Sequence, residues 1–230
     1  RVAYLTEDDR NKSGLYRFMP RFRSSRVGNY ERGGKLQMAR VVGQPNADLI
    51  VASVGDNYRI EWVDVPDPDA NRVPIDAAFS LADASGSVSG PFAQGWRSGA
   101  LRMSRGEGIW YSRGKFYIVD TSTGVNASGQ RGRGEGAVWE YDPGRETLRA
   151  IFVSLDQAAA NNPDNITVSP RGGIVLCEDG GESPDAFGPG ARLVGLTNQA
   201  ESYIFAKNNV QLTADQIGAA GKVVAAGDYR

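Results

Sequence analysis

The sequence contains no histidine, and it has a single cysteine, Cys177. Without imidazole there can be no Ser-His-Asp triad, no cysteine nucleophile paired with histidine and none of the usual zinc sites. No disulfide can form within the chain, and we interpret Cys177, which lies in an apolar run, as a buried structural thiol. Any metal site must therefore use oxygen ligands, which favours hard cations such as calcium.

Long apolar runs and a strong charge of either sign are also absent. No segment approaches the length of a membrane span, and the formal net charge of −1 gives no reason to expect a nucleic-acid partner. The chain begins RVAYLTEDD, with neither an initiator methionine nor a signal peptide, so we expect a fragment or a processed chain. Nothing in the composition points to a particular oligomeric state.

What is present is a repeated pattern of short strands separated by turns rich in glycine and proline. An apolar strand that ends in Asp or Glu, then a loop and a second strand, occurs three times, at 2–20, 115–143 and 172–197. In the second and third copies a strand also comes before this unit and another follows it, at 107–112, 147–154, 164–169 and 201–209. Four-stranded antiparallel units in series are typical of propeller blades.

The pattern predicts an all-β fold, a partial β-propeller of four-stranded blades that spans residues 1–230 as one domain. We expect two complete blades and one incomplete blade whose last strand is 36–43. Residues 44–104 fit the repeat less well and are expected to be an insertion between blades. Short helical segments are expected at 74–85, 92–104, 156–162 and 213–220.

Carboxylates stand at both ends of the predicted hairpins. Asp164 and Glu178 are nearly symmetric about the turn at Arg171, and Glu107 and Asp120 are nearly symmetric about the turn at 113–114. In a hairpin, the start of the first strand lies beside the end of the second, so each pair should come together.

Glu7, with its neighbours Asp8 and Asp9, stands at the equivalent strand end in the first copy. Because the inner strands of a propeller run along its central channel, we expect these ends to converge on one mouth of that channel. Gathered carboxylates repel one another unless a cation neutralises them, which favours an oxygen-ligand metal site. The alternative is that Asp and Glu simply close strands at turns, and it stays open for Asp120 in particular.

The tetrapeptide RGEG occurs twice, at 105–108 and 133–136. The first copy leads into an apolar strand, whereas the second closes a glycine-rich loop that we expect to be solvent-exposed. We therefore favour Arg105 and Glu107 over Arg133 and Glu135 as site residues. An arginine two residues before a metal ligand can direct its guanidinium at an anion held by the metal. A surface salt bridge is equally compatible with this spacing.

The motifs YLTEDD, RGEGIWY, FYIVDT, WEYDP, NPDNITVSP and RLVGLT, taken in this order, resemble the PhoX family of bacterial alkaline phosphatases. The resemblance covers most of the chain and weakens between about 43 and 97. It implies a propeller that hydrolyses small phosphate monoesters with calcium and iron at the channel mouth. It also implies a periplasmic or secreted protein, because members are usually exported by the twin-arginine route.

The resemblance further implies the roles of particular residues. The metal ligands would be Glu7, Glu107, Asp164 and Glu178, and Arg105 would be the catalytic residue that contacts the phosphate. The family's cysteine ligand to iron comes from an earlier motif, resembling TCEEN, which is absent here, as expected for a chain that lacks the N-terminal part. The iron-ligand role is therefore not transferred to Cys177.

Two other functions stay open from the residues alone. A non-catalytic propeller that binds calcium would use the same carboxylates, and so would a metal-dependent propeller hydrolase of the lactonase type.

Overall fold

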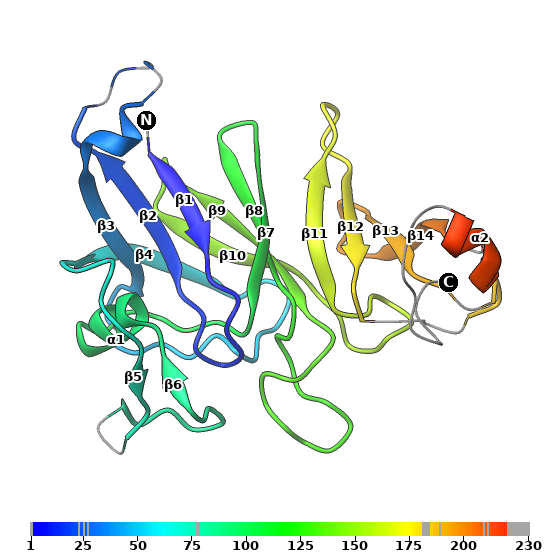
Figure 1. Ribbon diagram of the computed structural model, residues 1–230, viewed down its shortest axis with the longest axis horizontal. Helices are drawn as coiled ribbons and strands as arrows, with labels where there is room; N and C mark the ends of the chain where they lie inside the picture. The colour runs from blue at the N-terminus through cyan, green and yellow to red at the C-terminus, as the bar shows by residue number, and fades with distance from the viewer. Residues whose placement is uncertain are drawn as a thin grey trace.

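The computed structural model describes residues 2–22, 24, 26, 28–76, 79–180, 185–188, 190–208, 210 and 212–219. Within these residues the chain forms an eight-stranded antiparallel sheet, a four-stranded antiparallel sheet and a two-stranded ribbon. The eight-stranded sheet consists of two four-stranded units joined edge to edge, here called the first and second sheets, and the separate four-stranded sheet is called the third. These three follow one another along the molecule in Figure 1. In each sheet the strands are hydrogen-bonded in sequence order, as expected for consecutive hairpins. The mostly β fold and its antiparallel pairing agree with the prediction from the sequence.

The first sheet consists of β1 (Ala3–Thr6), β2 (Leu15–Pro20), β3 (Gly34–Val41) and β4 (Asn57–Val65), with the short 3-10 helix η1 (Tyr30–Arg32) before β3. β4 pairs with β3 from Leu36↔Val65 to Val41↔Ile60. The sheet therefore does not end at 36–43 as expected, because a strand from within 44–104 completes it.

The strands predicted for the second and third copies are confirmed. The second sheet consists of β7 (Gly106–Ser112), β8 (Lys115–Asp120), β9 (Ala137–Asp142) and β10 (Thr147–Val153). The third consists of β11 (Pro163–Val168), β12 (Ile174–Glu178), β13 (Arg192–Leu196) and β14 (Ser202–Lys207). β4 and β10 also pair with each other, which joins the first two sheets edge to edge.

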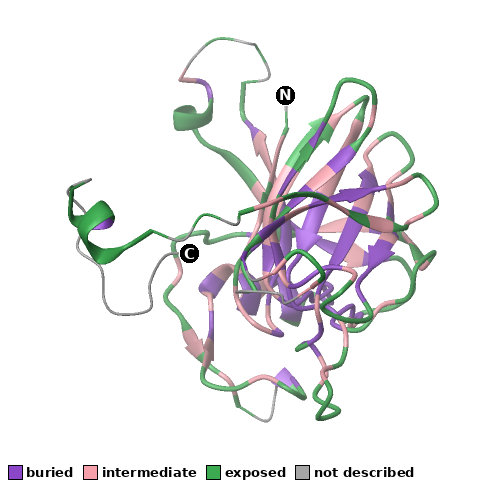
Figure 2. Cartoon of the chain, turned by 90° about the vertical axis from the view of Figure 1, so that its right-hand side faces the viewer, coloured by how far each residue is buried: buried purple, intermediate pink, exposed green. Residues whose placement is uncertain are grey.

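The second sheet is buried on both faces. Successive side chains of its strands point to opposite sides, and each side packs into a different core. On β8, Ile118 belongs to the core shared with the first sheet, and Val119 to the core shared with the third. Trp139 and Val138 divide in the same way on β9. Burial on both faces explains why β8 and β9 read as nearly continuous apolar runs. Figure 2 shows the buried residues concentrated in the packed strands.

The helical predictions are only partly confirmed. α1 (Gly90–Arg97) begins at Ser89, whose hydroxyl accepts a hydrogen bond from Phe92 N, and it packs Phe92 and Trp96 into a core with β3 and β4. α2 (Ala214–Ala219) lies in the predicted segment 213–220. The described residues of 74–85 and 156–162 contain no α-helix. None of the described helices is long and apolar enough to cross a membrane.

A small ribbon of β5 (Val73–Pro74) and β6 (Ser87–Val88) lies beside α1 (Figure 1). β7, the edge strand of the second sheet, contacts β1 of the first sheet and β11 of the third. Glu7, Glu107 and Asp164 lie at the ends of these three edge strands, and Glu178 ends the neighbouring strand β12.

Candidate functional site

Gly106, the first glycine of the RGEG motif at 105–108, allows the end of β1 to approach β7. Its N–H donates to Glu7 O (3.1 Å) and to Ser13 Oγ (2.9 Å). A Cβ at this position would lie 2.9 Å from Ser13 Oγ, closer than real Cβ contacts allow. Glycine is therefore needed here to bring the segment after β1 beside Glu107.

Gly108, the second glycine of the motif, has the same role toward the third sheet. A Cβ at Gly108 would lie 2.8 Å from Asn165 Cα and 2.9 Å from Asp164 O. Glu107, between the two glycines, thus lies where the edge strands of all three sheets meet. The short RGEG motif explains this meeting sterically, because a side chain at either glycine would separate the sheets.

Both Glu107 and Asp164 lie in β-bulges at the starts of their hairpins. The pairing of β7 with β8 shifts register between Gly106 and Ile109, and that of β11 with β12 shifts between Pro163 and Asn165. A bulge leaves a residue unpaired and turns its side chain away from the ladder. This frees both carboxylates from their cross-strand positions.

Arg105 links two of the carboxylates at this point. Its Nε donates to Asp8 Oδ1 (2.8 Å), and one terminal nitrogen donates to Asp8 Oδ2 (3.3 Å) and Glu107 Oε1 (3.1 Å). Its backbone has a φ of +66°, a left-handed conformation that is uncommon for residues other than glycine. Backbone strain at a residue whose side chain holds two carboxylates is typical of a functional position.

The electrostatics show that three carboxylates act on one another. Burial, then hydrogen bonding to Asp8 and the charges of Asp8 and Asp164, raise the pKa of Glu107 to about 7. Burial would also raise the pKa of Asp8, but hydrogen bonds from Arg105 and Glu107 lower it below its usual value. Asp164 Oδ1 is buried and has no hydrogen-bond partner among the described residues. A buried carboxylate oxygen without a donor is unfavourable, and a cation would satisfy it.

These observations test whether the residues fit the metals that the sequence implies. The oxygen donors of Asp8, Glu107 and Asp164, one of them without a partner, fit the chemistry of calcium. In the described part of the chain, no group of three or more metal-ligating side chains is assembled closely enough to hold an ion. These carboxylates therefore offer donors without forming a complete site. Nothing among the described residues supports the iron site that the resemblance implies.

Glu7, predicted as a ligand, already has partners within its own sheet. Its Oε2 accepts hydrogen bonds from Tyr16 OH (2.6 Å) and Gly14 N (3.2 Å). Burial raises the pKa of the Glu7 carboxyl. Its neighbour Asp8, and not Glu7, is the residue of this acidic run that reaches Arg105.

Glu178, also predicted as a ligand, is bound on both oxygens by an arginine. Arg192 Nε donates to Oε2 (2.7 Å), another Arg192 nitrogen donates to Oε1 (2.6 Å), and Asn161 N donates to Oε1 (2.7 Å). Both side chains of the ion pair are almost completely buried, at 1% and 0% exposure. On the backbone Glu178 pairs with Pro163, so Asp164 and Glu178 are neighbours. Glu178 is held by Arg192 and Asn161, whereas Asp164 Oδ1 has no partner among the described residues.

Asp120 and Cys177 complete the predicted set. Both Asp120 oxygens lie 3.1 Å from Ser104 N, and burial raises the pKa of this fully buried carboxyl to about 7. Asp120 thus closes its hairpin from the inside, as the alternative interpretation has it. Cys177 is exposed, so its interpretation as a buried thiol is wrong.

The comparisons with known proteins decide the family. The family model described as alkaline phosphatase PhoX matches residues 1–229. The chain belongs to the PhoX family. The solved structure of Pseudomonas fluorescens PhoX in complex with vanadate, a transition state analogue, is similar with a TM-score of 0.57 and 18% sequence identity. The match covers 89% of this chain and 41% of that one, and at this identity it shows the fold alone. No curated protein sequence matches.

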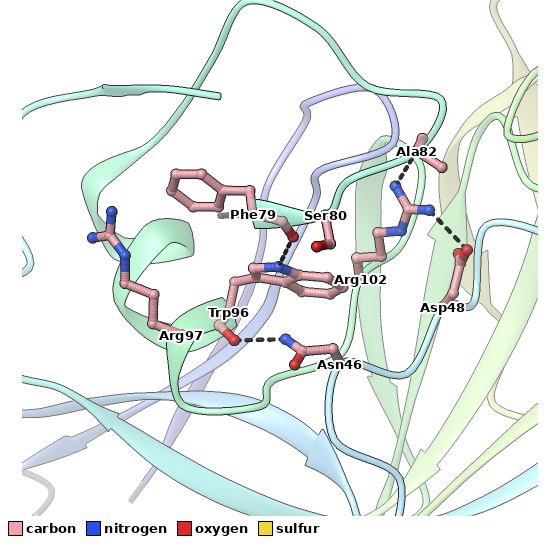
Figure 3. A pocket seen from close by; sticks show the side chains of 8 residues that line it. All are labelled: Asn46, Asp48, Phe79, Ser80, Ala82, Trp96, Arg97 and Arg102. Carbon is pink, nitrogen blue, oxygen red and sulfur yellow. Dashed lines mark hydrogen bonds and ion pairs between the residues drawn. The ribbon is translucent and has the colours of Figure 1, made fainter. Parts of the chain in front are cut away.

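This PhoX-family chain also has a cavity of about 470 Å³, which Figure 3 shows with the residues that line it. Arg102, which lines the cavity and is almost fully buried, donates to Asn11 O (3.0 Å) and Ala82 O (2.8 Å) and pairs with Asp48 (2.7 Å). The lining also includes Asn46, Phe79, Ser80, Trp96 and Arg97. Through its bond to Asn11, Arg102 supports the backbone beside the carboxylate site.

The residue that sequence reasoning missed is Arg10. It directly follows the acidic run of Glu7, Asp8 and Asp9. Burial, Arg133 and Arg105 lower the pKa of its guanidinium, whereas the charge of Asp8 raises it. Its position directly after the acidic residues of TEDD could have indicated this from the sequence.

Proposed function

We propose that this chain carries the phosphate-binding part of a metal-dependent alkaline phosphatase that hydrolyses small phosphate monoesters. The observation that carries the proposal is Arg105, bonded to Asp8 and Glu107 where β1, β7 and β11 meet, in a member of the PhoX family. The similar Pseudomonas protein binds vanadate as a transition state analogue, which supports phosphoryl transfer. The chain spans 41% of that protein, so the activity of the whole enzyme is part of the proposal.

We infer that the three sheets are blades of a propeller. The contacts of β7 with β1 on one side and β11 on the other support this arrangement, because inner strands of adjacent blades lie side by side around a channel. Asp8, Glu107 and Asp164 then stand at one mouth of that channel.

Arg105 is the group that would bind the phosphate. A guanidinium presents a planar fork of donors that matches the oxygens of a phosphate as well as those of a carboxylate. In the structure Asp8 occupies this fork. Phosphate would therefore exchange with at least one Asp8 oxygen, and Arg105 would hold the phosphoryl group beside Glu107.

Asp8, Glu107 and Asp164 are the residues that would hold calcium. When bound, the ion supplies positive charge that stabilises the phosphate oxygens during transfer. Glu7 and Glu178 stay predicted ligands, but they would first have to release Tyr16 and Arg192. With a pKa of about 7, Glu107 is protonated below that pH and ionised above it, so its carboxylate is available under alkaline conditions.

The test is hydrolysis of para-nitrophenyl phosphate with calcium and iron supplied. Arg105→Ala and Glu107→Gln should each lower kcat/KM by roughly 100-fold or more, as when a donor or charge at a transition state is removed. Glu135→Gln is the matched control, because it makes the same change in the other RGEG copy and should retain activity. Wild-type activity in Glu107→Gln would defeat the assignment of the site.

The same experiment separates the functions that the sequence left open. A calcium-dependent rise in melting temperature without ester hydrolysis would indicate a non-catalytic calcium-binding protein. Lactone hydrolysis without phosphatase activity would indicate an enzyme of the lactonase type.

A further inference from the structure

Ser104 ties three distant segments together at a buried point behind Arg105. Its Oγ lies 2.7 Å from Asn11 Oδ1 and 2.9 Å from Gly132 O, and it accepts a hydrogen bond from Asn11 N (3.3 Å). Ser104 and Asn11 are 0% and 1% exposed. The Ser104 node, formed by Asn11, Ser104 and Gly132, therefore fixes the relative positions of the three backbones.

Each member of the Ser104 node has an arginine as its immediate neighbour. Arg10 precedes Asn11, Arg105 follows Ser104 and Arg133 follows Gly132. The Ser104 node therefore brings the backbones of these three arginines, from distant parts of the sequence, close together beside the carboxylate site. Burial, then the charges of Arg133 and Arg105, lower the pKa of the Arg10 guanidinium.

The second RGEG copy, expected to be solvent-exposed, is built into this arrangement. Arg133 itself is exposed, but the glycines on either side of it are buried. A Cβ at Gly132 would lie 1.8 Å from Asn11 Oδ1, and one at Gly134 would lie 2.6 Å from Gly124 Cα. As in the first copy, the glycines permit close backbone contact, so the backbone of Arg133 is fixed beside Asn11 and Gly124.

The three arginines differ in whether their donors are occupied. Arg105 is bonded to Asp8 and Glu107. Among the described residues, the guanidinium groups of Arg10 and Arg133 donate no hydrogen bond and form no ion pair. Gathered like charges repel one another, and a bound anion would relieve the repulsion and use the free donors.

We propose that Arg10 and Arg133 form a second anion subsite, which binds a carboxylate or second phosphate on the leaving group of a phosphomonoester. The proposal deepens the proposed function and rests on it in one respect, since Arg105 is taken to bind the phosphoryl group that is transferred. The enzyme would then prefer monoesters whose leaving group is itself anionic.

The test compares 3-phosphoglycerate with glycerol 3-phosphate, which carry a carboxylate and a hydroxymethyl group at the same position. Their binding to the whole chain in the presence of calcium is measured by calorimetry, and their hydrolysis by phosphate release. Arg10→Ala and Arg133→Ala should each weaken 3-phosphoglycerate binding about tenfold, the effect of losing one charged hydrogen bond. Glycerol 3-phosphate binding should change less than about twofold.

Two further variants control this comparison. Arg105→Ala should weaken both ligands, because both carry the phosphoryl group. Arg145→Ala removes an exposed arginine from the turn between β9 and β10 and should change neither. Arg10→Lys keeps the charge but not the fork, so it should retain part of the preference. Unchanged melting temperatures would show that the variants are folded.

The outcomes separate this proposal from the phosphatase assignment. If Arg10→Ala lost affinity equally for the two ligands, or lost none, the subsite would be overturned. Hydrolysis of both ligands could still persist, and the phosphatase assignment would then stand. Selective loss of 3-phosphoglycerate binding without any hydrolysis would support the subsite and defeat the phosphatase assignment. A wild-type chain that binds neither ligand, or does not prefer 3-phosphoglycerate, would also overturn the subsite.

Discussion

The hairpins β7–β8 and β11–β12 are alike in sequence, with a carboxylate near each end, but their four carboxylates have different surroundings. In both hairpins the first carboxylate, Glu107 or Asp164, lies in a β-bulge and acts on the shared site. In both, the second carboxylate, Asp120 or Glu178, is buried and held by internal partners. Position at a strand end therefore does not decide the role of a carboxylate, whereas the bulge does.

The hairpins differ in how the buried carboxylate is stabilised. Asp120 accepts hydrogen bonds from the neutral Ser104 N–H, and burial still raises its pKa to about 7. Glu178 instead has a full ion pair with Arg192. A buried charge can be kept by a counter-charge or can take up a proton, and the two hairpins use these two solutions.

The largest effect is expected from breaking the ion pair. Arg192→Met should lower the free energy of unfolding by about 3–5 kcal/mol, because it leaves Glu178 buried without a counter-charge. Urea unfolding measures this loss. The double variant Arg192→Met with Glu178→Leu should recover most of it, and Arg149→Met at an exposed position of β10 is the control. A loss below about 1 kcal/mol would place the pair among ordinary surface salt bridges.

The second largest effect is expected in how the free energy of unfolding depends on pH through Asp120. Because the pKa of Asp120 is raised in the folded state, its favourable contribution to the free energy of unfolding is present below the ordinary aspartate pKa of 3.8 and is lost as pH rises to about 7. Asp120→Asn removes this titration. Relative to wild type, the variant should gain on the order of 2–4 kcal/mol between pH 4 and pH 7. Urea unfolding of both proteins across this range measures the difference, and a constant difference would contradict the raised pKa.

The sequence was sufficient to predict the strands of both hairpins. Runs such as KFYIVD and IVLCE are rich in β-branched or aromatic residues and are flanked by turn residues, so local pattern and tertiary structure agree. It also selected Arg105, Glu107 and Asp164, because the RGEG motif and the hairpin ends depend on local spacing.

What the sequence could not predict depends on contacts between distant residues. A bulge shifts the register by one residue, so the symmetric positions of Asp164 and Glu178 did not show which side chain reaches the site. The partner of Glu178 is Arg192, from the next strand, and no spacing rule indicates that pair. The exposure of Cys177 and the Ser104 node were missed for the same reason.

The smallest effect is expected from the contact that holds the two hairpins together. In Gly108→Ala the new Cβ would meet the backbone of Asn165 and Asp164, so β7 and β11 must separate slightly. Such overpacking should lower the free energy of unfolding by about 1–3 kcal/mol. The control is Arg113→Ala at the opposite end, where an exposed arginine donates to Pro170 O (2.5 Å), and it should lower that free energy by less than about 1 kcal/mol. Urea unfolding compares the two variants, and calcium titration by calorimetry should show weaker binding in Gly108→Ala alone. Equal effects on calcium binding would mean that the hairpins are aligned by their whole length, and not by the glycine beside Glu107.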